Sequence, residues 1–127
     1  MIGMILAASI MCAVLFGLGV FQLLLAAGAP LGRLAWGGQY RVLPTRLRVG
    51  SLVSTCLYAV FSLVVLDRAG MLSVLPGQTA RILVWVIVGL FSLGAIPNLI
   101  SRSRPERYVM APLSLFLSGL SLVIALG

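Results

Sequence analysis

The sequence has no histidine, no lysine and only two acidic residues, Asp67 and Glu106. Zinc, haem and di-iron centres take their ligands mainly from histidine, cysteine and clustered carboxylates, so the common metal sites lack ligands here. The two cysteines, Cys12 and Cys56, lie in separate apolar runs and form no Cys-x-x-Cys pair, which argues against a thiol oxidoreductase and against a disulfide. We therefore expect no metal and no cofactor, and we expect both thiols to act as small apolar side chains.

Charged residues are also scarce. They make up only 9% of the 127 residues, whereas 61% are hydrophobic, and the mean hydropathy is +1.20. Soluble domains contain about 45–50% apolar and about 25% charged residues. A soluble domain of this size leaves roughly a third of its unfolded-chain surface exposed, so it cannot hide this much apolar surface from water. The solvent for most of the chain is therefore lipid.

Four apolar runs without charged residues cover about 2–27, 49–66, 82–101 and 108–127. Each approaches the ~20 residues that a helix needs to cross the hydrocarbon core of a membrane. The first run has no basic segment before it and is longer than the apolar part of a signal peptide, so we interpret it as a retained helix. The sequence thus predicts an all-α integral membrane protein, a single four-transmembrane-helix bundle over residues 1–127.

Arginine supplies all nine basic charges, and the formal net charge is +7. The connections 28–48 and 102–107 together carry +6, whereas the connection 67–81 carries +1 and holds Asp67 and Arg68 as an expected exposed pair. Because cytoplasmic loops carry the excess of basic residues, this asymmetry predicts two Arg-rich cytoplasmic loops and both termini outside. We expect a multi-pass protein of a bacterial inner membrane whose arginines meet anionic lipid headgroups rather than nucleic acid.

Local patterns predict several helix boundaries. Ser103 and Glu106 fit a capping box, in which Ser103 caps the fourth helix and the Glu106 side chain bonds back to the Ser103 amide. Thr79 is expected to cap the third helix. Pro97 is expected to kink that helix or to end it near Ala95, because proline removes a backbone donor.

Small and weakly polar residues recur at helical spacing in two of the runs, so that each set shares one helix face. These polar-stripe residues are Ser51, Thr55, Tyr58, Ser62, Ser114, Ser118 and Ser121. They predict either a packing interior, since membrane helices associate through small residues and weak hydrogen bonds, or a weakly polar path for a solute. Only Gln22 and Asn98 are strongly polar within the spans. A further small-residue seam, Ser9, Ala13 and Gly17, favours a homo-oligomer.

The connection 28–48 is unusually long for a small bundle and combines arginine, glycine and aromatic residues. Arginine offers bidentate donors to phosphate and carboxylate, and the Gly37-Gly38 pair lets backbone amides approach an anion closely. The predicted surface for an anion, a lipid or a protein partner consists of Arg33, Trp36, Gln39, Tyr40, Arg41, Arg46, Arg48, Arg102, Arg104 and Arg107. Membrane anchoring is the competing interpretation, because interfacial Arg, Trp and Tyr need no ligand.

The segments WGGQYRVLPTRLRVGS and SRSRPERYVMAP resemble a family of small bacterial four-span membrane proteins. The resemblance covers nearly the whole chain and implies the same four-span frame, but it transfers no catalytic or binding residue. Small multidrug transporters also have four spans and rely on a carboxylate within the first helix. The first run here carries no charge, so proton-coupled cation export is not expected.

These features favour a non-enzymatic, oligomeric membrane protein with a transport or channel-like role for a small solute. The alternative is an accessory or assembly subunit of a membrane complex, which docks its Arg-rich face on a partner or on anionic lipid. An enzyme acting on lipid phosphate ranks third, because the acid and base groups available to it are one aspartate, one glutamate, tyrosines and cysteines.

Overall fold

The computed structural model describes residues 2–127, and within this range the chain forms four long helices and no strand. The helices are α1 (Ile2–Ala26), α2 (Thr45–Arg68), α3 (Thr79–Leu99) and α4 (Ala111–Leu126), and a π-helical turn, η3 (Glu106–Met110), leads directly into α4. All four are long and apolar enough to cross a membrane when η3 and α4 are taken together. The prediction of an all-α chain with four candidate spans is thereby confirmed.

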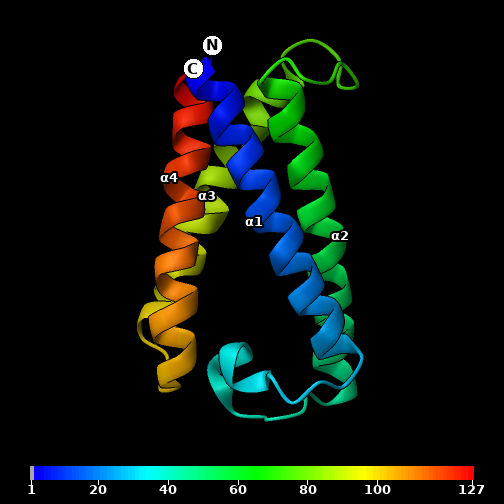
Figure 1. The fold of residues 1–127 in the computed structure, drawn as a ribbon, viewed down its shortest axis with the longest axis vertical. Coiled ribbons are helices and arrows are strands. Elements are labelled where there is room, and N and C mark those ends of the chain that lie inside the picture. Colours follow the sequence, from blue (N-terminus) through cyan, green and yellow to red (C-terminus); the bar gives the residue numbers. More distant parts are fainter. Residues whose placement is uncertain (1) are drawn as a thin grey trace.

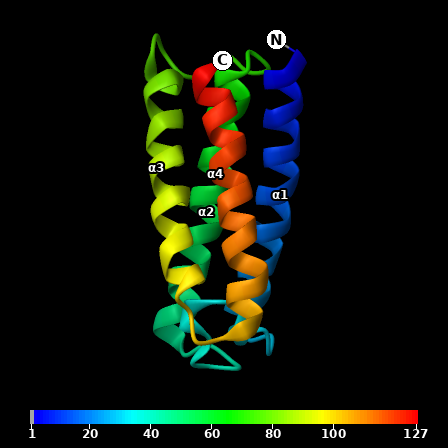
Figure 2. The same cartoon turned by 90° about the vertical axis from the view of Figure 1, so that its left-hand side faces the viewer.

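The helices form two antiparallel pairs, α1 with α2 and α3 with α4. Both termini and the α2–α3 connection lie at one end, which we call the termini end; segment 27–44 and the α3–η3 connection lie at the opposite, arginine-rich end (Figures 1 and 2). Helices α1 and α4 meet near the termini end and diverge toward the arginine-rich end (Figure 1). Segment 27–44 lies across the end at which the two pairs have separated.

The core lies where the two pairs meet, and all four helices contribute to it. Its fully buried large side chains include Met11, Leu15, Val65, Val84, Ile87, Leu117 and Ile124. Outward-facing side chains are equally apolar: Phe16 is 75% exposed and Leu93 is 66% exposed. Continuous exposed apolar surface of this kind is typical of protein that faces lipid rather than water.

Helix α3 runs through Pro97 to Leu99, so of the two predicted effects of this proline, a kink or an early end near Ala95, the early end is wrong. Proline removes only one helical hydrogen bond, and a contact with the neighbouring helix stabilises the turn that contains it. The Asn98 side-chain amide donates to the Ser114 hydroxyl of α4 at 2.9 Å. This bond fastens the last turn of α3 to its partner helix.

The two predicted N-caps are absent among the described residues. Helix α3 begins without a side-chain cap, so Thr79 does not cap it. The capping box is wrong as well, because the Ser103 hydroxyl donates to the Arg33 carbonyl and the Glu106 carboxylate accepts the Gly37 N–H. Both side chains are bound to the long α1–α2 connection, which no local pattern places beside them.

Asp67 and Arg68 bind backbone groups rather than each other, contrary to the predicted exposed pair. The Asp67 carboxylate accepts the N–H groups of Val74 and Leu75 at 2.7 and 2.9 Å. Arg68 donates to the Gly127 carbonyl at 2.7 Å. These bonds attach the α2–α3 connection and the last turn of α4 to the end of α2.

Leu117→Ala tests the packing between the helix pairs. Leu117 is 1% exposed, and its truncation leaves a void in the core. Unfolding within a micelle transfers no apolar surface from lipid to water, so the substitution loses packing only. We therefore expect the low end of the range for Leu→Ala in a core, a loss on the order of 2 kcal/mol in the free energy of unfolding. Leu115→Ala, on the exposed face of the same helix, is expected to cost less than about 0.5 kcal/mol. Unfolding in detergent micelles measures both, and equal losses would contradict this orientation of α4.

Candidate functional site

Segment 27–44 joins α1 to α2, and we call it the bridging loop. It contains two short 3₁₀ turns, η1 (Gly32–Leu34) and η2 (Trp36–Gly38). The Gly32 N–H donates to the Arg41 carbonyl at 2.9 Å, which draws the two sides of the loop together. The loop is therefore folded against the arginine-rich end of the bundle (Figure 1).

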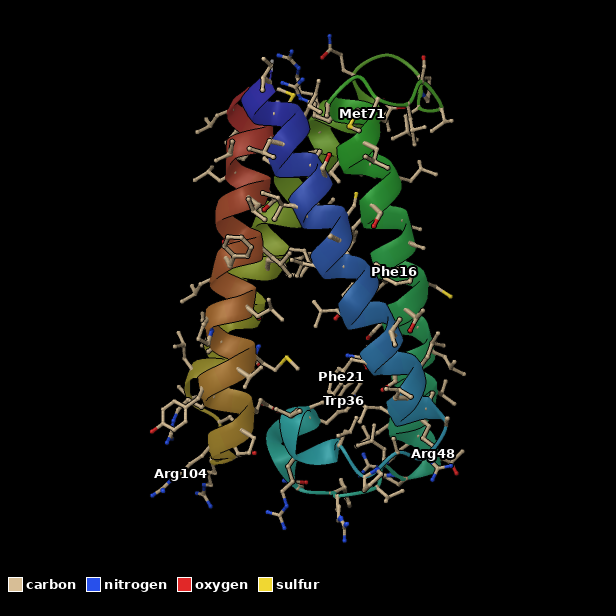
Figure 3. All side chains as sticks on the ribbon, in the orientation of Figure 1. Phe16, Phe21, Trp36, Arg48, Met71 and Arg104 are labelled. Atoms are coloured by element: carbon tan, nitrogen blue, oxygen red, sulfur yellow. The ribbon has the colours of Figure 1, made fainter. Side chains whose placement is uncertain are left out.

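Trp36 is fixed against the first turns of α2. Its indole N–H donates at 3.3 Å to the hydroxyl of the fully buried Ser51. The ring lies over Gly50, where a Cβ would come within 2.8 Å of the indole, so only glycine leaves room for it. The φ of Trp36 is +54°, a conformation that costs a residue with a side chain on the order of 1 kcal/mol. Figure 3 shows Trp36 beside Phe21, at the end where the pairs have separated.

Glu106 is a buried carboxylate, 3% exposed, in the π-helical turn that precedes α4. It accepts the N–H of Gly37 at 3.1 Å. The Ser103 hydroxyl donates to the Arg33 carbonyl of the same loop. These two bonds join the bridging loop to the α3–α4 pair, and the Trp36 bond joins it to α2. The loop therefore connects both halves of the bundle at their open end.

The backbone amides of the Gly37-Gly38 pair are both bonded within the chain, because Gly37 donates to Glu106 and Gly38 donates to the Ala35 carbonyl. Gly37 has a φ of +78°, which glycine adopts readily, and its N–H is bound to the carboxylate of the chain itself rather than left for an external anion. Gly38 has a φ of +72°, and a Cβ there would overlap the Ser103 side chain. Both glycines are therefore required by the contact between the bridging loop and the start of the fourth span.

A cavity of about 220 Å³ lies between the two helix pairs and borders the bridging loop. All four helices contribute to its lining, together with η3 and the loop. The lining residues are Leu18, Phe21, Gln22, Leu34, Ala35, Trp36, Ser54, Tyr58, Phe91, Asn98, Met110, Leu113, Ser114 and Leu117. The wall thus combines aromatic and aliphatic side chains with amides and hydroxyls, and none of its members carries a formal charge.

Most polar side chains in the cavity wall have partners within the protein. Asn98 donates to Ser114 at 2.9 Å, and the Ser54 hydroxyl donates to a carbonyl one turn earlier at 3.0 Å. Gln22 differs, because it is only 9% exposed and its amide oxygen has no hydrogen-bond partner among the described residues. The Tyr58 hydroxyl lies beside the Gln22 side chain. The Gln22 oxygen is therefore enclosed by protein atoms rather than open to the cavity.

The two predicted polar stripes divide between the cavity and the helix contacts. Tyr58 and Ser114 line the cavity. Thr55 donates to a carbonyl of α1 at 3.4 Å, and Ser118 shares a hydrogen bond with Ser92 of α3 at 2.6 Å. The remaining stripe residues bond to neighbouring groups and lie outside the cavity lining: Ser51, Ser62 and Ser121. The structure brings two of the seven together at this cavity, and Thr55, Tyr58 and Ser62 also line a second pocket of about 370 Å³ between α1 and α2.

Two arginines of the predicted binding surface belong to the start of α2, which begins at Thr45 rather than near residue 49. Arg46 donates to the Tyr40 hydroxyl at 3.2 Å. Arg48 donates to the Leu43 carbonyl at 2.8 Å. Both side chains thus hold the end of the bridging loop against α2 while part of each guanidinium stays available.

The other members of the predicted surface differ in their contacts. Arg107 donates to the Ser101 carbonyl at 3.3 Å, and its guanidinium lies 5.0 Å from the centre of the Tyr108 ring. Arg33 and Arg41 flank a surface depression of about 270 Å³. Exposed side chains without a place in the cavity are Gln39, Arg102 and Arg104. The arginine-rich surface is therefore broad, with one depression between two of its arginines.

Gln22, Asn98 and Ser54 were not predicted as site residues from the sequence. Gln22 and Asn98 did stand out as the only strongly polar residues in the spans. Both lie within about one helical turn of the arginine-rich ends of α1 and α3, so they share a depth in the bundle. This shared depth is the signal that could have placed them together.

Comparisons of the chain with protein-family models, with curated proteins and with solved structures find no match. Function is therefore inferred from the geometry of the cavity and of the bridging loop. Both are built from contacts between residues far apart in the sequence.

Glu106→Ala tests the attachment of the bridging loop. The substitution leaves the Gly37 N–H without its acceptor, which costs about 1–3 kcal/mol. Trypsin cleaves after Arg33 and Arg41 in the loop. The cleavage rate is proportional to the population of molecules in which the loop is open. We therefore expect the cleavage rate to rise by at least about fivefold.

Glu106→Gln is the matched control, because its amide oxygen still accepts the Gly37 N–H. We expect its cleavage rate to stay within about threefold of the wild type. Identical rates for the wild type and Glu106→Ala would show that the carboxylate does not hold the loop.

Proposed function

We propose that this protein is a transporter or channel-like protein that binds a small neutral solute in the cavity between its two helix pairs. In this proposal it lies in a bacterial inner membrane, with the arginine-rich end in the cytoplasm and both termini outside, as the charge asymmetry predicts. The bridging loop then separates the cavity from the cytoplasm and acts as its gate.

The observation that carries the proposal is a cavity with polar walls inside four apolar helices. Polar side chains are costly in a membrane interior, so they are retained where they hold helices together or serve a ligand. Helix packing accounts for the bonded pair Asn98 and Ser114 but not for the open volume beside it. A volume of about 220 Å³ is below the ~300–1,000 Å³ of typical small-molecule sites and fits a solute of few heavy atoms.

The lack of formal charge in the cavity wall favours a neutral solute. An ion would have to give up its hydration without gaining a counter-charge, which is unfavourable in a low-dielectric interior. Proton-coupled and voltage-driven proteins use ionisable groups within their spans. The acidic residue closest in sequence to the cavity lining is Glu106, in η3 before α4, and it is engaged with the bridging loop. The arrangement supports movement of a neutral solute down its own gradient.

Two barriers bound the cavity. Toward the termini end, α1 and α4 converge and the space between the pairs is filled by core side chains such as Met11, Leu15 and Ile87. At the other end the bridging loop is held by individual hydrogen bonds made by Trp36, Gly37 and Ser103. A few hydrogen bonds can break and re-form together as a loop opens, on the microsecond to millisecond scale of gating motions.

Ser114→Phe tests the cavity as the solute path. The larger side chain fills the volume beside Asn98, so we expect the glycerol and urea permeability of proteoliposomes to fall to that of protein-free liposomes. Leu115→Phe, which adds a similar ring on the exposed side of the same helix, is expected to retain wild-type permeability. Stopped-flow light scattering measures the permeabilities.

Two outcomes would contradict the transport proposal. One is wild-type protein, correctly folded in the liposomes, that leaves both permeabilities at the protein-free level. The other is equal permeability for Ser114→Phe and Leu115→Phe.

A second candidate function follows from the depression between Arg33 and Arg41. Two guanidinium groups beside one concave surface suit a phosphate or carboxylate, because each offers parallel donors. In this alternative the protein is an accessory or assembly subunit whose arginine-rich surface binds an anionic lipid headgroup or docks on a partner.

Arg41→Lys separates a specific headgroup site from simple membrane anchoring. Lysine keeps the charge but cannot form two parallel hydrogen bonds. If the site is specific, we expect the variant to retain at least about threefold less anionic phospholipid than the wild type through purification. Arg81→Lys, an exposed arginine at the termini end, is the control. Native mass spectrometry counts the bound lipids. Equal retention by the two variants would show that these arginines only anchor the protein in the membrane.

The small-residue seam on α1 supports the expectation of a homo-oligomer. Ser9, Ala13 and Gly17 are exposed, and nothing lies within 4 Å of a Cβ placed on Gly17. Such a face lets a second membrane helix approach closely. We keep this face of α1 as the proposed contact with a second copy or with another subunit.

A further inference from the structure

The pocket of about 370 Å³ between α1 and α2 is a second space in the bundle, and we call it the α1–α2 groove. Its lining comes from residues 12–23 of α1 and residues 55–66 of α2. Phe16 and Val20 in this lining are 75% and 42% exposed, so the groove opens toward the lipid around the bundle. Tyr58 lines both the groove and the central cavity and so forms part of the wall between them.

The groove is apolar although several residues of its wall carry polar atoms. The Thr55 hydroxyl donates to carbonyls of both helices, at 3.1 and 3.4 Å. The Ser62 hydroxyl donates to a carbonyl one turn earlier at 2.9 Å, and the Cys12 thiol donates to the Ser62 carbonyl at 3.8 Å. The Tyr58 hydroxyl lies beside Gln22, in the wall of the cavity. These donors are used within the protein, so the groove suits a hydrocarbon occupant.

Arg48 lies where the groove face of α2 reaches the arginine-rich end. Figure 3 shows Phe16 at mid-height and Arg48 near this end, both on the α1–α2 side of the bundle. The residues of this face of α2 follow one another at alternating steps of four and three, which is the helical repeat: Arg48, Leu52, Thr55, Ala59, Ser62 and Leu66.

The Arg48 guanidinium has room for an anion. Its Nε donates to the Leu43 carbonyl at 2.8 Å, whereas its two terminal nitrogens have no hydrogen-bond partner within residues 2–127 and are not enclosed by protein atoms. They lie beside the end of α1, 3.1 and 3.5 Å from the position that a Cβ would take on Gly28. Asp67 is at the opposite end of α2, and Glu106 is bonded to the bridging loop. The counter-charge for this fixed cation therefore has to come from outside the chain.

We propose that the α1–α2 groove and Arg48 form one binding site for an anionic glycerophospholipid, with an acyl chain in the groove and the phosphate on the Arg48 guanidinium. Arginine binds phosphate through parallel donors, and anionic headgroups gather at basic membrane faces. The site is separate from the central cavity, so it stands or falls independently of solute transport.

The length of the groove matches one lipid. Residues 12–23 cover about 16 Å of α1 at ~1.5 Å per residue, close to the ~15 Å that one leaflet contributes to the hydrocarbon core. Gly28, beside the guanidinium, lies about 7 Å farther along the chain direction of α1. The polar headgroup region extends roughly 5–8 Å beyond the hydrocarbon, so the guanidinium lies at the depth of a phosphate.

A helix of a second copy is the competing occupant of the groove. Membrane helices approach one another closely over small residues. The groove side of α1 carries Phe16, Val20 and Leu23 instead, and all three project into the lipid. These side chains hold a helix of about 10–12 Å diameter away from the groove, whereas an acyl chain is thin and flexible enough to lie between them.

Ala59→Phe tests the acyl-chain half of the site. Ala59 is exposed and lines the groove, so a ring at this position fills the groove without entering the core. Val60→Phe, at the neighbouring lipid-facing position outside the groove lining, is the matched control. We expect Ala59→Phe to bind phosphatidylglycerol at least about fivefold more weakly than the wild type, because the packing of the chain is lost, and Val60→Phe to bind it equally well. Native mass spectrometry of protein titrated with this lipid in detergent measures the affinities.

Arg48→Gln tests the phosphate half. Glutamine removes the positive charge, and its amide still offers a donor to the Leu43 carbonyl. Arg46→Gln removes the same charge from an exposed position in the same turn and is the control. We expect the preference for phosphatidylglycerol over the net-neutral phosphatidylcholine to fall by at least about threefold in Arg48→Gln and to stay unchanged in Arg46→Gln.

A phosphatidylglycerol with a photoreactive diazirine on its acyl chain locates the chain in the wild-type protein. We expect the crosslinks, identified by peptide mass spectrometry, to concentrate in residues 12–23 and 55–66. Crosslinks spread evenly over the four helices would overturn the site, as would equal lipid affinities of Ala59→Phe and Val60→Phe. An unchanged lipid preference in Arg48→Gln would also overturn it and leave Arg48 as a membrane anchor. A dimer that is lost only in Ala59→Phe, with lipid binding intact, would place a second copy in the groove instead.

Discussion

The hydrogen bond between the Gly37 amide and the buried Glu106 carboxylate is the interaction on which the arginine-rich half of the structure depends. The two helix pairs converge at the termini end and separate toward the other, so their open ends are joined by the bridging loop rather than by helix packing. A charge-assisted bond from a backbone amide is stronger than a neutral one. It also fixes the loop at the point where Trp36 must adopt a positive φ to reach Ser51. The cavity exists in this form because the loop is held there.

The frame of the molecule was predictable from the sequence because the deciding information is local. An apolar run of about 20 residues identifies a membrane-crossing helix without knowledge of its neighbours. Features that depend on distant partners were not predictable. Ser103 and Glu106 have the spacing of a capping box, yet both bond to residues about seventy positions earlier, in the bridging loop. Pro97 carries a local signal to end the helix, and a side-chain bond from Asn98 to α4 overrides it.

The site was predictable only in part, for the same reason. Helical spacing placed Tyr58 and Ser114 on weakly polar helix faces. It could not distinguish a hydroxyl in a helix contact from a hydroxyl that lines the cavity. Gln22 and Asn98 were visible as rare polar residues, but only the fold shows that both line the same cavity. The Gly-Gly pair was predicted to let backbone amides approach an external anion, whereas the structure places the side chain of Glu106 on the Gly37 amide.

The central proposal is that the cavity accommodates a neutral solute beneath a loop held by Glu106. The most direct measurement is a structure of the protein in lipid nanodiscs with glycerol present, at a resolution that shows individual waters. We predict density for the solute inside the cavity, within hydrogen-bonding distance, about 2.7–3.2 Å, of a polar side chain of its lining, with the Gly37 amide still on Glu106. A collapsed cavity, or an open cavity that contains only water, would contradict the proposal.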